Sequence, residues 1–150
     1  MNDALWLGAG IYLAGPVPYF SPEDREGLIA FVEDARDFAL QNGKKSALVE
    51  FNNRSGRFVN ASRYIFAYDF NTTNLALPMQ PDLIGTSRLD IKDSNGVSFC
   101  RDFTAQAKDG SGLSYLLYPD PADNMTMKLK LDYVMKVDDT WFLGSGIYAK

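Results

Sequence analysis

The sequence predicts a single α+β domain in which a long N-terminal helix packs on a mainly antiparallel, five-stranded sheet. Three observations lead to this fold class. Apolar residues recur every three to four positions after residue 21, the pattern changes to alternation near residue 63, and three further strand-like segments follow residue 112. A loop and a further helix separate the second strand from the third. This order of elements is typical of an α+β layer arrangement.

The long helix is expected to begin at Ser21-Pro22, with Ser as N-cap and Pro at the first helical position. Gly43 is expected to end it. A shorter helix should follow and end near Asn52-Asn53. The stripe of the long helix that is expected to pack in the core comprises Leu28, Phe31, Val32, Ala35, Phe38 and Ala39.

The alternating segment from Arg63 to Asp69 places aromatic residues on one face and smaller apolar residues on the other, which predicts a strand covered on both faces. Turn-forming residues follow, so residues 62–77 predict a hairpin. A long loop then contains a turn at residues 90–96 and leads into a helix over residues 97–108. The closing strands are expected at residues 113–118, 127–136 and 140–149.

The composition favours binding over catalysis, so the chain is not expected to be an enzyme. Its 150 residues carry a net charge of −4, which disfavours nucleic acid as a partner. The absence of histidine excludes Ser-His-Asp and Cys-His nucleophiles, and an enzyme would have to use carboxylates alone. Cys100, the single cysteine, can form neither an internal disulfide nor a thiolate zinc site, and we expect it to be buried.

The two ends of the sequence contain the same strand. Residues 4–12 and 140–148 share the frame aromatic-Leu-Gly-small-Gly-Ile-Tyr, which duplication explains better than coincidence between two apolar strands. We therefore expect residues 1–14 to be the last strand of a preceding repeat unit, and residues 15–150 to form the domain itself.

One acidic segment partly matches a calcium-binding loop. Asp93 and Asn95 precede Gly96 at suitable spacing, but the first ligand position falls on Ile91 and the closing position on Asp102 instead of a glutamate. A solvated turn explains this segment better. No metal and no cofactor are predicted.

Aromatic and cationic residues on the predicted strands are the candidate binding groups. Tyr64, Phe66 and Tyr68 share one strand face, and Lys128 and Lys130 alternate on a later strand. Such a set suits a small carboxylate, because rings exclude water while a cation pairs with the oxygens. Alternatively, the rings belong to the core and the lysines lie on the outer face. The strand pattern alone is compatible with both.

An ordered series of motifs resembles the single-Cache sensor domain of the sCache_2 type, over residues 22–149. The series comprises residues 44–52, 57–58, 64–69, 83–85, 107–115 and 141–148, together with Asp90-x-x-Asp93-x-x-Gly96 and Lys130-x-x-Tyr133-Val134.

The resemblance implies a PAS-like fold with the loop-helix insertion lying over the sheet. It also implies an extracytoplasmic sensor domain, part of a membrane-anchored histidine kinase or chemoreceptor, that binds a small metabolite between sheet and insertion. A carboxylate is the expected ligand, with Lys130 as its first partner. A second copy of the chain or neighbouring repeats are the other expected contacts. Carried over to this chain, the ligand-binding residues would be Tyr64, Phe66, Tyr68, Arg101, Tyr115 and Lys130.

The chain departs from the family pattern at three positions. Leu77 stands where the family often has histidine, and Leu113 and Leu117 stand where a tryptophan is common. Each change would remove a polar or aromatic pocket group, which implies a more apolar ligand, a different ligand or none. With no ligand, the domain would be a structural spacer repeat in an extracellular multi-domain array.

Overall fold

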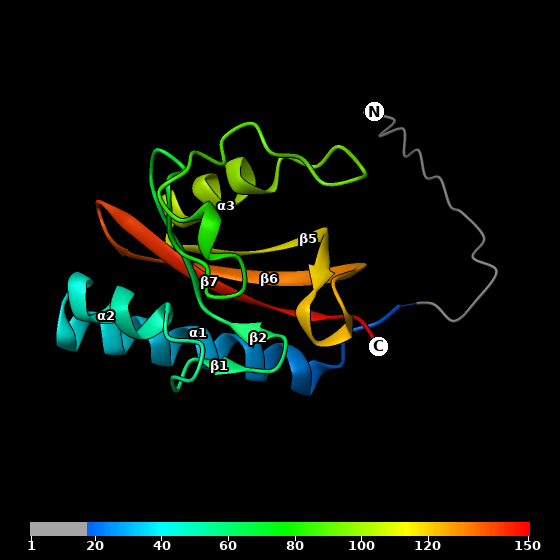
Figure 1. The fold of residues 1–150 in the computed structure, drawn as a ribbon, viewed down its shortest axis with the longest axis horizontal. Coiled ribbons are helices and arrows are strands. Elements are labelled where there is room, and N and C mark those ends of the chain that lie inside the picture. Colours follow the sequence, from blue (N-terminus) through cyan, green and yellow to red (C-terminus); the bar gives the residue numbers. More distant parts are fainter. Residues whose placement is uncertain (1–17) are drawn as a thin grey trace, which may run out of the picture.

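The structure is a computed structural model that describes residues 18–150. It has three layers (Figure 1). Helices α1 (Pro22–Asn42) and α2 (Lys44–Phe51) lie on one side of a sheet, and α3 (Phe99–Lys108) lies on the other side with the long loop that precedes it. The strand expected at residues 4–12 and the domain boundary expected after residue 14 lie outside the described residues. No helix within residues 18–150 combines the length and the apolar character that crossing a membrane requires.

The capping signals place α1 as predicted. The Ser21 hydroxyl accepts a hydrogen bond from the Asp24 backbone N–H at 3.1 Å, and Pro22 opens the helix. Gly43 has a φ of 82°, a conformation that glycine adopts without strain, and it separates α1 from α2. The buried residues of α1 all belong to the predicted stripe: Leu28, Val32, Ala35 and Ala39.

The five-stranded sheet is antiparallel throughout, in the order β4-β3-β7-β6-β5. The last strand along the chain is therefore central, because β7 pairs with β3 on one side and with β6 on the other. The predicted fold class and hairpin are confirmed. The strands are β3 (Phe66–Asp69), β4 (Asn74–Ala76), β5 (Ser111–Asp120), β6 (Thr126–Asp138) and β7 (Trp141–Tyr148).

One predicted strand differs, because the segment expected over residues 63–69 is interrupted at Ile65. Its first part, β2 (Arg63–Tyr64), instead pairs with β1 (Val59–Asn60) in a separate two-stranded ribbon. The Ser145 hydroxyl donates a hydrogen bond of 2.7 Å to the Tyr64 carbonyl oxygen. This side chain supplies the partner that the main sheet does not offer there.

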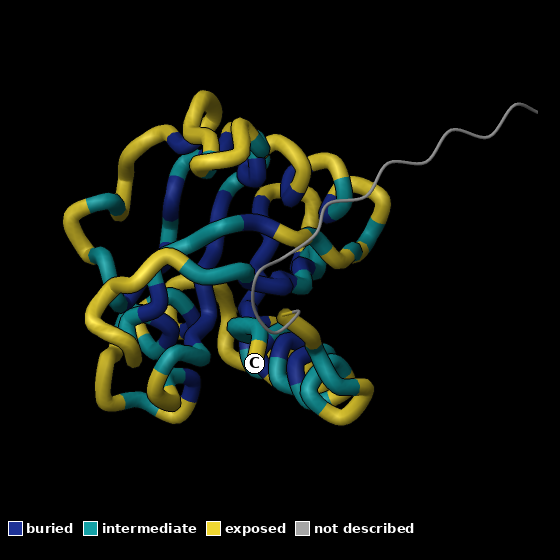
Figure 2. The backbone as a smooth tube through the Cα atoms, turned by 90° about the vertical axis from the view of Figure 1, so that its right-hand side faces the viewer, coloured by how far each residue is buried: buried dark blue, intermediate teal, exposed yellow. Residues whose placement is uncertain are grey.

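Each face of the sheet has its own apolar cluster, as the alternation in residues 63–69 predicts. The face that packs on α1 and α2, here called the α1 face, includes Ile65, Ala67 and Leu131. The opposite face, here called the cavity face, includes Phe66, Tyr68 and Val134. Figure 2 shows the buried chain concentrated in the strands and in the helix stripes that meet them, with exposed loops outside.

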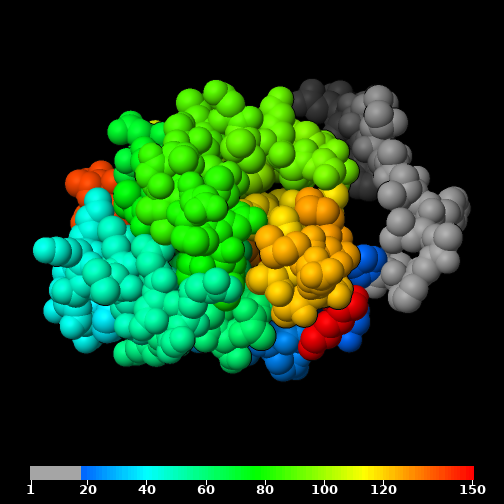
Figure 3. All heavy atoms as spheres, viewed as in Figure 1, coloured from blue at the N-terminus to red at the C-terminus, as the bar shows by residue number. Residues whose placement is uncertain are grey.

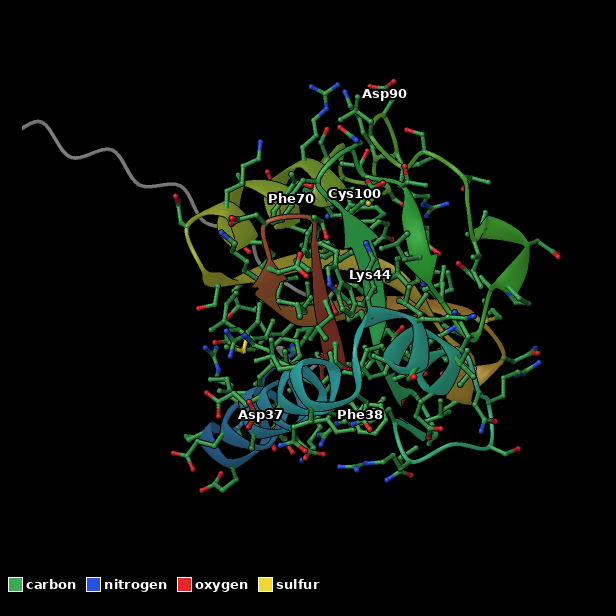
Figure 4. All side chains as sticks on the ribbon, turned by 90° about the vertical axis from the view of Figure 1, so that its left-hand side faces the viewer. Asp37, Phe38, Lys44, Phe70, Asp90 and Cys100 are labelled. Atoms are coloured by element: carbon green, nitrogen blue, oxygen red, sulfur yellow. The ribbon has the colours of Figure 1, made fainter. Side chains whose placement is uncertain are left out.

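Residues 77–98 and α3 together cover the cavity face and are here called the cover. In the view of Figure 3, the green part of this segment forms a continuous layer of atoms between α2 and the β5–β6 hairpin. The cover contains a short 3-10 turn, η1 (Pro81–Leu83). Figure 4 shows Cys100 of α3 and Phe70 on this side of the sheet, with Asp37 and Phe38 of α1 on the other. Cys100 is buried as predicted, and burial raises the pKa of its thiol to about 11.

The expected turn at residues 90–96 is a fastening point of the cover. One carboxylate oxygen of Asp93 accepts backbone N–H bonds from Asn95 and Val97, at 2.8 and 2.9 Å. The other oxygen accepts the Leu117 N–H of β5 at 2.9 Å. Backbone donors therefore occupy both oxygens of Asp93, and the carboxylate ties the loop to the sheet.

Candidate ligand-binding site

The register of three strands brings the candidate site together on the cavity face. Residues directly opposite one another in an antiparallel ladder point to the same face of the sheet. Lys130 of β6 lies opposite Leu116 of β5 and Tyr148 of β7. Two residues further along β6, Asp132 lies opposite Gly146 of β7. Lys130 and Asp132 are therefore neighbours on one face.

Lys130 is a buried cation within a set of aromatic rings. Its side chain is only 3% exposed. Its Nζ lies 5.0 Å from the ring centres of Tyr64 and Tyr118, 5.5 Å from that of Tyr148 and 5.6 Å from that of Phe66. Aromatic faces attract a cation at these distances, and the attraction is stronger away from water.

Asp132 is the charge partner of Lys130. Its Oδ1 lies 3.2 Å from Lys130 Nζ, and its side chain is 2% exposed, yet Oδ1 has no partner with hydrogen-bond geometry within the described part of the chain. Burial raises the pKa of Asp132 to about 6, although the Lys130 ammonium opposes this. Burial alone would lower the pKa of Lys130, but the Asp132 carboxylate keeps it above the ordinary value.

Two glycines of β7 make room for these groups. A Cβ atom at Gly146 would collide with Oδ1 of Asp132 and with Cε of Lys130. A Cβ atom at Gly144 would lie 2.7 Å from the Phe66 ring and 2.6 Å from the Tyr133 carbonyl oxygen. The Gly-x-Gly pattern of this strand therefore reflects close packing on the cavity face.

A small cavity lies between these residues and the cover. Its volume is about 10 Å³, which is room for about one water molecule. Any ligand with several heavy atoms therefore needs part of the cover to move. The cavity is lined by Tyr64, Phe66, Tyr68, Leu77, Phe99, Phe103, Leu116, Tyr118, Lys130 and Asp132.

Four of the six predicted site residues meet at this cavity, namely Tyr64, Phe66, Tyr68 and Lys130. Lys130 therefore does not lie on an outer face. The rings of the three aromatic residues agree with both interpretations of the strand pattern, a ligand pocket and an apolar core. They line the cavity and also belong to the apolar cluster of the cavity face.

The other two predicted site residues do not reach the cavity. Arg101 lies on the outer side of α3, because Cys100 and Phe103 turn inward, and its side chain is 55% exposed and paired with Asp90. Tyr115 pairs with Leu131 in the ladder and so shares the α1 face, where its hydroxyl accepts a hydrogen bond from Arg25 at 2.7 Å. The structure therefore does not bring these two residues together with the other four, and their part in ligand binding stays a prediction.

The departures from the family pattern have unequal consequences. Leu77 lines the cavity, so a leucine in place of histidine does make this site more apolar. Leu113 and Leu117 pair with Tyr133 and Leu129 and lie on the α1 face, so the absence of tryptophan there removes nothing from the cavity. That part of the expectation is corrected.

The sequence reasoning also missed several lining residues, above all Asp132 and Tyr118. The signal for Asp132 was present, because the period-2 pattern of β6 places it on the same face as Lys130. Tyr118 shares its face with Leu116 for the same reason. Both faces of β5 carry apolar residues there, so alternation alone did not show which face is turned to the cavity.

A larger hollow of about 500 Å³ opens at the surface behind this site. It lies between the start of α1, the β1–β2 ribbon and the end of β7, and it is lined by Gly146, Tyr148 and several charged residues. Among these, Lys128 Nζ contacts Asp120 and Asp123 at 2.9 and 2.8 Å. Since its two lysines, Lys128 and Lys150, have acidic partners and it is open to water, this hollow is a weaker candidate than the enclosed cavity.

Comparison with known proteins identifies the family of this fold and site. The profile of the single Cache domain 2 family matches residues 33–150, most of the chain. The chain belongs to this family. Cache domains of this kind are periplasmic sensor domains of histidine kinases and chemoreceptors, which confirms the expected family and extracytoplasmic location. They are sensing modules and not enzymes in themselves.

The Cache domain is similar in sequence to part of one curated protein, the sensor histidine kinase MctS of Rhizobium johnstonii. The two are 31% identical over 86 residues, which cover 57% of this chain and 18% of the kinase. The chain thus spans less than a fifth of the length of that relative.

Solved structures share the fold at lower sequence identity. A methyl-accepting chemotaxis protein of Vibrio parahaemolyticus has a TM-score of 0.72 at 24% identity, covering 84% of this chain and 88% of its own. A periplasmic sensor domain of a chemotaxis protein scores 0.64 at 24% identity, covering 82% and 88%. A Cache chemosensory domain described for its carboxylic acid recognition scores 0.63 at 23% identity, covering 84% and 86%.

Proposed function

We propose that this Cache domain senses a small carboxylate, which binds in the cavity between the sheet and the cover. The observation that carries the proposal is the burial of the Lys130 ammonium at the cavity, among aromatic rings. Tyr64, Phe66 and Tyr68 would supply the apolar wall, and Lys130 would pair with the ligand oxygens. Buried charged hydrogen bonds of this kind are among the stronger polar contacts in proteins.

Two further observations support an anionic ligand. Oδ1 of Asp132 lies 3.2 Å from Lys130 Nζ but forms no hydrogen bond within residues 18–150, so the ammonium of Lys130 is imperfectly paired. The pKa of Asp132 is already raised to about 6, so taking up a proton costs this carboxylate little. A ligand carboxylate could then replace Asp132 as the counter-ion of Lys130. The carboxylic acid ligand described for one structural relative agrees with this choice.

Binding would move the cover, because the cavity has a volume of only about 10 Å³. Acetate alone has four heavy atoms, more than this space holds. The cover is tied to the sheet by discrete contacts such as Asp93 to Leu117, which can break and re-form as a unit. Displacement of the cover is thus the structural change that a ligand would cause, and a receptor can transmit it.

The domain would act as the input of a larger protein. We propose a membrane-anchored histidine kinase or chemoreceptor as the parent, because the sequence relative is a sensor kinase and two structural relatives are chemotaxis proteins. A second copy of the domain, or a neighbouring repeat, would be its protein contact in that setting.

A second candidate function is a spacer repeat that binds no ligand. The small volume of the cavity and the existing Lys130–Asp132 contact favour it, because both describe a site that is closed without a ligand. Under this reading, the pair fixes the packing of the cavity face, and contacts between domains carry the function.

A thermal-shift screen separates the two candidates. Acetate, propionate, pyruvate, lactate and succinate would be added to the purified domain, with amino acids and amines in parallel. Ligand at about 100 times its Kd stabilises a protein by ~2.7 kcal/mol, which raises the Tm of a domain of this size by several degrees. A screen without any shift would contradict the sensor proposal and support the spacer.

The variant that locates the site is Lys130→Met with Asp132→Asn. Replacing both residues avoids leaving one buried charge unpaired, which alone costs several kcal/mol. The double variant is expected to fold and to lose the shift with carboxylates. Lys128→Met is the matched control, since Lys128 lies on the same strand face but pairs with Asp120 and Asp123, which do not line the cavity. A shift that the double variant retains would place the ligand elsewhere.

A further inference from the structure

The surface hollow of about 500 Å³ lies where β2 leaves the main sheet. The ladder between β3 and β7 ends at Gly144, whereas β7 continues to Tyr148. Because β2 turns away to pair with β1, no strand within residues 18–150 pairs with this edge of β7 beyond Gly144. The hollow occupies the gap and is lined there by residues 60–63 and 146–150. The departure of β2 from the sheet therefore opens a space beside the candidate site.

The hollow and the cavity are neighbours on the cavity face. Side chains two residues apart on a strand point to the same face. Lys128 lines the hollow and Lys130 lines the cavity, so the two spaces meet along β6. Tyr148 lies directly opposite Lys130 in the ladder, and it lines the hollow. Lys130 therefore lies at the boundary between the two spaces.

The ring of Tyr148 stands at this boundary. The residue is half-buried, and its ring centre lies 5.5 Å from Nζ of Lys130. Its hydroxyl donates a hydrogen bond of 2.6 Å to the Pro119 carbonyl oxygen. Gly146 also lines the hollow, and a Cβ atom there would collide with Asp132 and Lys130. On the side of β7, one aromatic ring and a glycine therefore separate the hollow from the ion pair.

The cover closes the other side of the cavity with more contacts. Tyr118, whose ring centre lies 5.0 Å from Lys130 Nζ, donates a hydrogen bond of 2.8 Å to Gln80 of the cover. Asp93 ties the cover to the Leu117 N–H at 2.9 Å. These contacts and the packing of α3 must break together before the cover can open. On the other side, one ring has to rotate about its side-chain bonds, and the hollow has room for it.

We propose that the hollow is the entrance to the cavity and that Tyr148 is its gate, so that water and a small solute reach Lys130 when this ring rotates. The inference rests on the proposed function, because it names the route of the ligand to that site. The cover still moves to make room for the ligand, and the ring closes behind it. The hydrogen bond to Pro119 holds the gate shut and therefore sets how often it opens.

The test measures how fast water reaches Lys130 in the ligand-free domain. NMR spectra of the lysine NH₃⁺ groups give the exchange rate of the ammonium hydrogens with water, and Lys128 at the hollow is the more exposed reference. Tyr148→Phe keeps the ring and removes its hydrogen bond to Pro119. Exchange at Lys130 should then be roughly fivefold faster than in the wild type, the effect of losing one net hydrogen bond from the closed state.

Tyr118→Phe is the matched control. It removes one hydrogen bond between the cavity wall and the cover, and it keeps a ring at a similar distance from Lys130 Nζ. Exchange at Lys130 in this variant should stay within about twofold of the wild-type rate. Low urea concentrations should leave the exchange in the wild type unchanged, because the rotation of one side chain exposes little surface.

Three results would overturn the inference. Wild-type exchange in Tyr148→Phe would show that the ring does not control access to Lys130. Acceleration in Tyr118→Phe by the same factor or more would mean that access runs through the cover or through a general loosening. A urea dependence equal to that of global unfolding would mean that Lys130 exchanges only from the unfolded chain.

The proposed function fails or stands by a different measurement. The exchange rates are obtained without ligand, so they do not depend on the thermal-shift screen. A screen without any shift, together with faster exchange in Tyr148→Phe alone, would contradict the sensor proposal and support Tyr148 as the gate for water. A carboxylate-induced shift together with wild-type exchange in Tyr148→Phe would support the sensor and contradict the gate.

Discussion

The α1 face and the cavity face of the sheet are both buried, but in residues 18–150 the buried charges of Lys130, Asp132 and Arg88 lie on the cavity face and in its cover. The α1 face packs aliphatic and phenylalanine side chains against two helices. The cavity face packs aromatic rings around an ion pair, and Oδ1 of Asp132 and Nε of Arg88 form no hydrogen bond within the described residues.

This difference indicates a division of roles. An apolar interface stabilises the fold through buried area and close packing. Buried charges with incomplete partners lower the stability of a folded domain, and such sites are typically retained for function. We therefore propose that the α1 face holds the domain together and that the cavity face is the part that responds to a ligand.

The largest expected effect is the loss of stability when one phenylalanine that packs against each face of the sheet is replaced by alanine. Phe51 of α2 is fully buried among Phe38 and Phe58, and Phe51→Ala should lower the free energy of unfolding by about 3–5 kcal/mol. Phe103 stacks on Phe66 at the cavity, and Phe103→Ala should cost about 1 kcal/mol less, because water can enter the space beside Lys130. Urea unfolding measures both. Equal losses would remove the energetic distinction between the faces.

The next effect tests how tightly the cavity face is packed. Gly146→Ala would press a methyl group against Asp132 and Lys130, and we expect a loss of about 1–3 kcal/mol. Gly27→Ala is the control, because an added Cβ there meets only the end of the Arg63 side chain, at 3.9 Å. Thermal unfolding of the two variants should therefore differ. A Gly146→Ala domain as stable as the control would show that the ion pair has room to move.

The cavity face should also show an unusual pH dependence. Since the pKa of Asp132 is raised to about 6 in the folded state, the folded domain binds this proton more tightly than the unfolded chain does. The wild type should therefore lose stability relative to Asp132→Asn as the pH rises from 4 to 6, by at most about 1.4 kcal/mol per pH unit. Urea unfolding across this range measures the difference. A relative gain would mean that Lys130 lowers the pKa of Asp132 instead.

The smallest effects are expected at the two surface residues that the sequence reasoning had assigned to the pocket. Arg101→Met and Tyr115→Phe remove exposed contacts with Asp90 and Arg25, and each should change the free energy of unfolding by less than about 0.5 kcal/mol. Neither should alter a ligand-induced thermal shift. A lost shift in either variant would extend the site beyond the cavity.

The fold was predictable because its signals are local. Ser21-Pro22 and Gly43 bound α1 through their own capping chemistry, and Tyr64, Phe66 and Tyr68 alternate with smaller residues. The interruption of that strand at Ile65 was not predictable, because Tyr64 pairs with β1 and accepts a hydrogen bond from the distant Ser145, and the local pattern shows neither contact. The same holds for the central position of β7, which only the pairing of strands decides.

The site was predictable only in part. Lys130 was found through its family motif, and its neighbour Asp132 follows from strand periodicity. The helix pattern could have placed Arg101 away from the cavity, because the buried positions Phe99, Cys100 and Phe103 leave it on the opposite side of α3. Arg88 carries no such pattern. It lies in an irregular loop, where burial depends on tertiary contacts alone.

The packing of Gly146 against Asp132 has a consequence for the evolution of the family. The two positions occupy one volume, so a side chain at one excludes an acid at the other. Positions 132 and 146 are therefore expected to covary among related domains, with glycine at 146 wherever an acid stands at 132. Loss of the acid before a substitution at 146 avoids the clash, and that order of events would convert the ion-paired site into one with a free lysine.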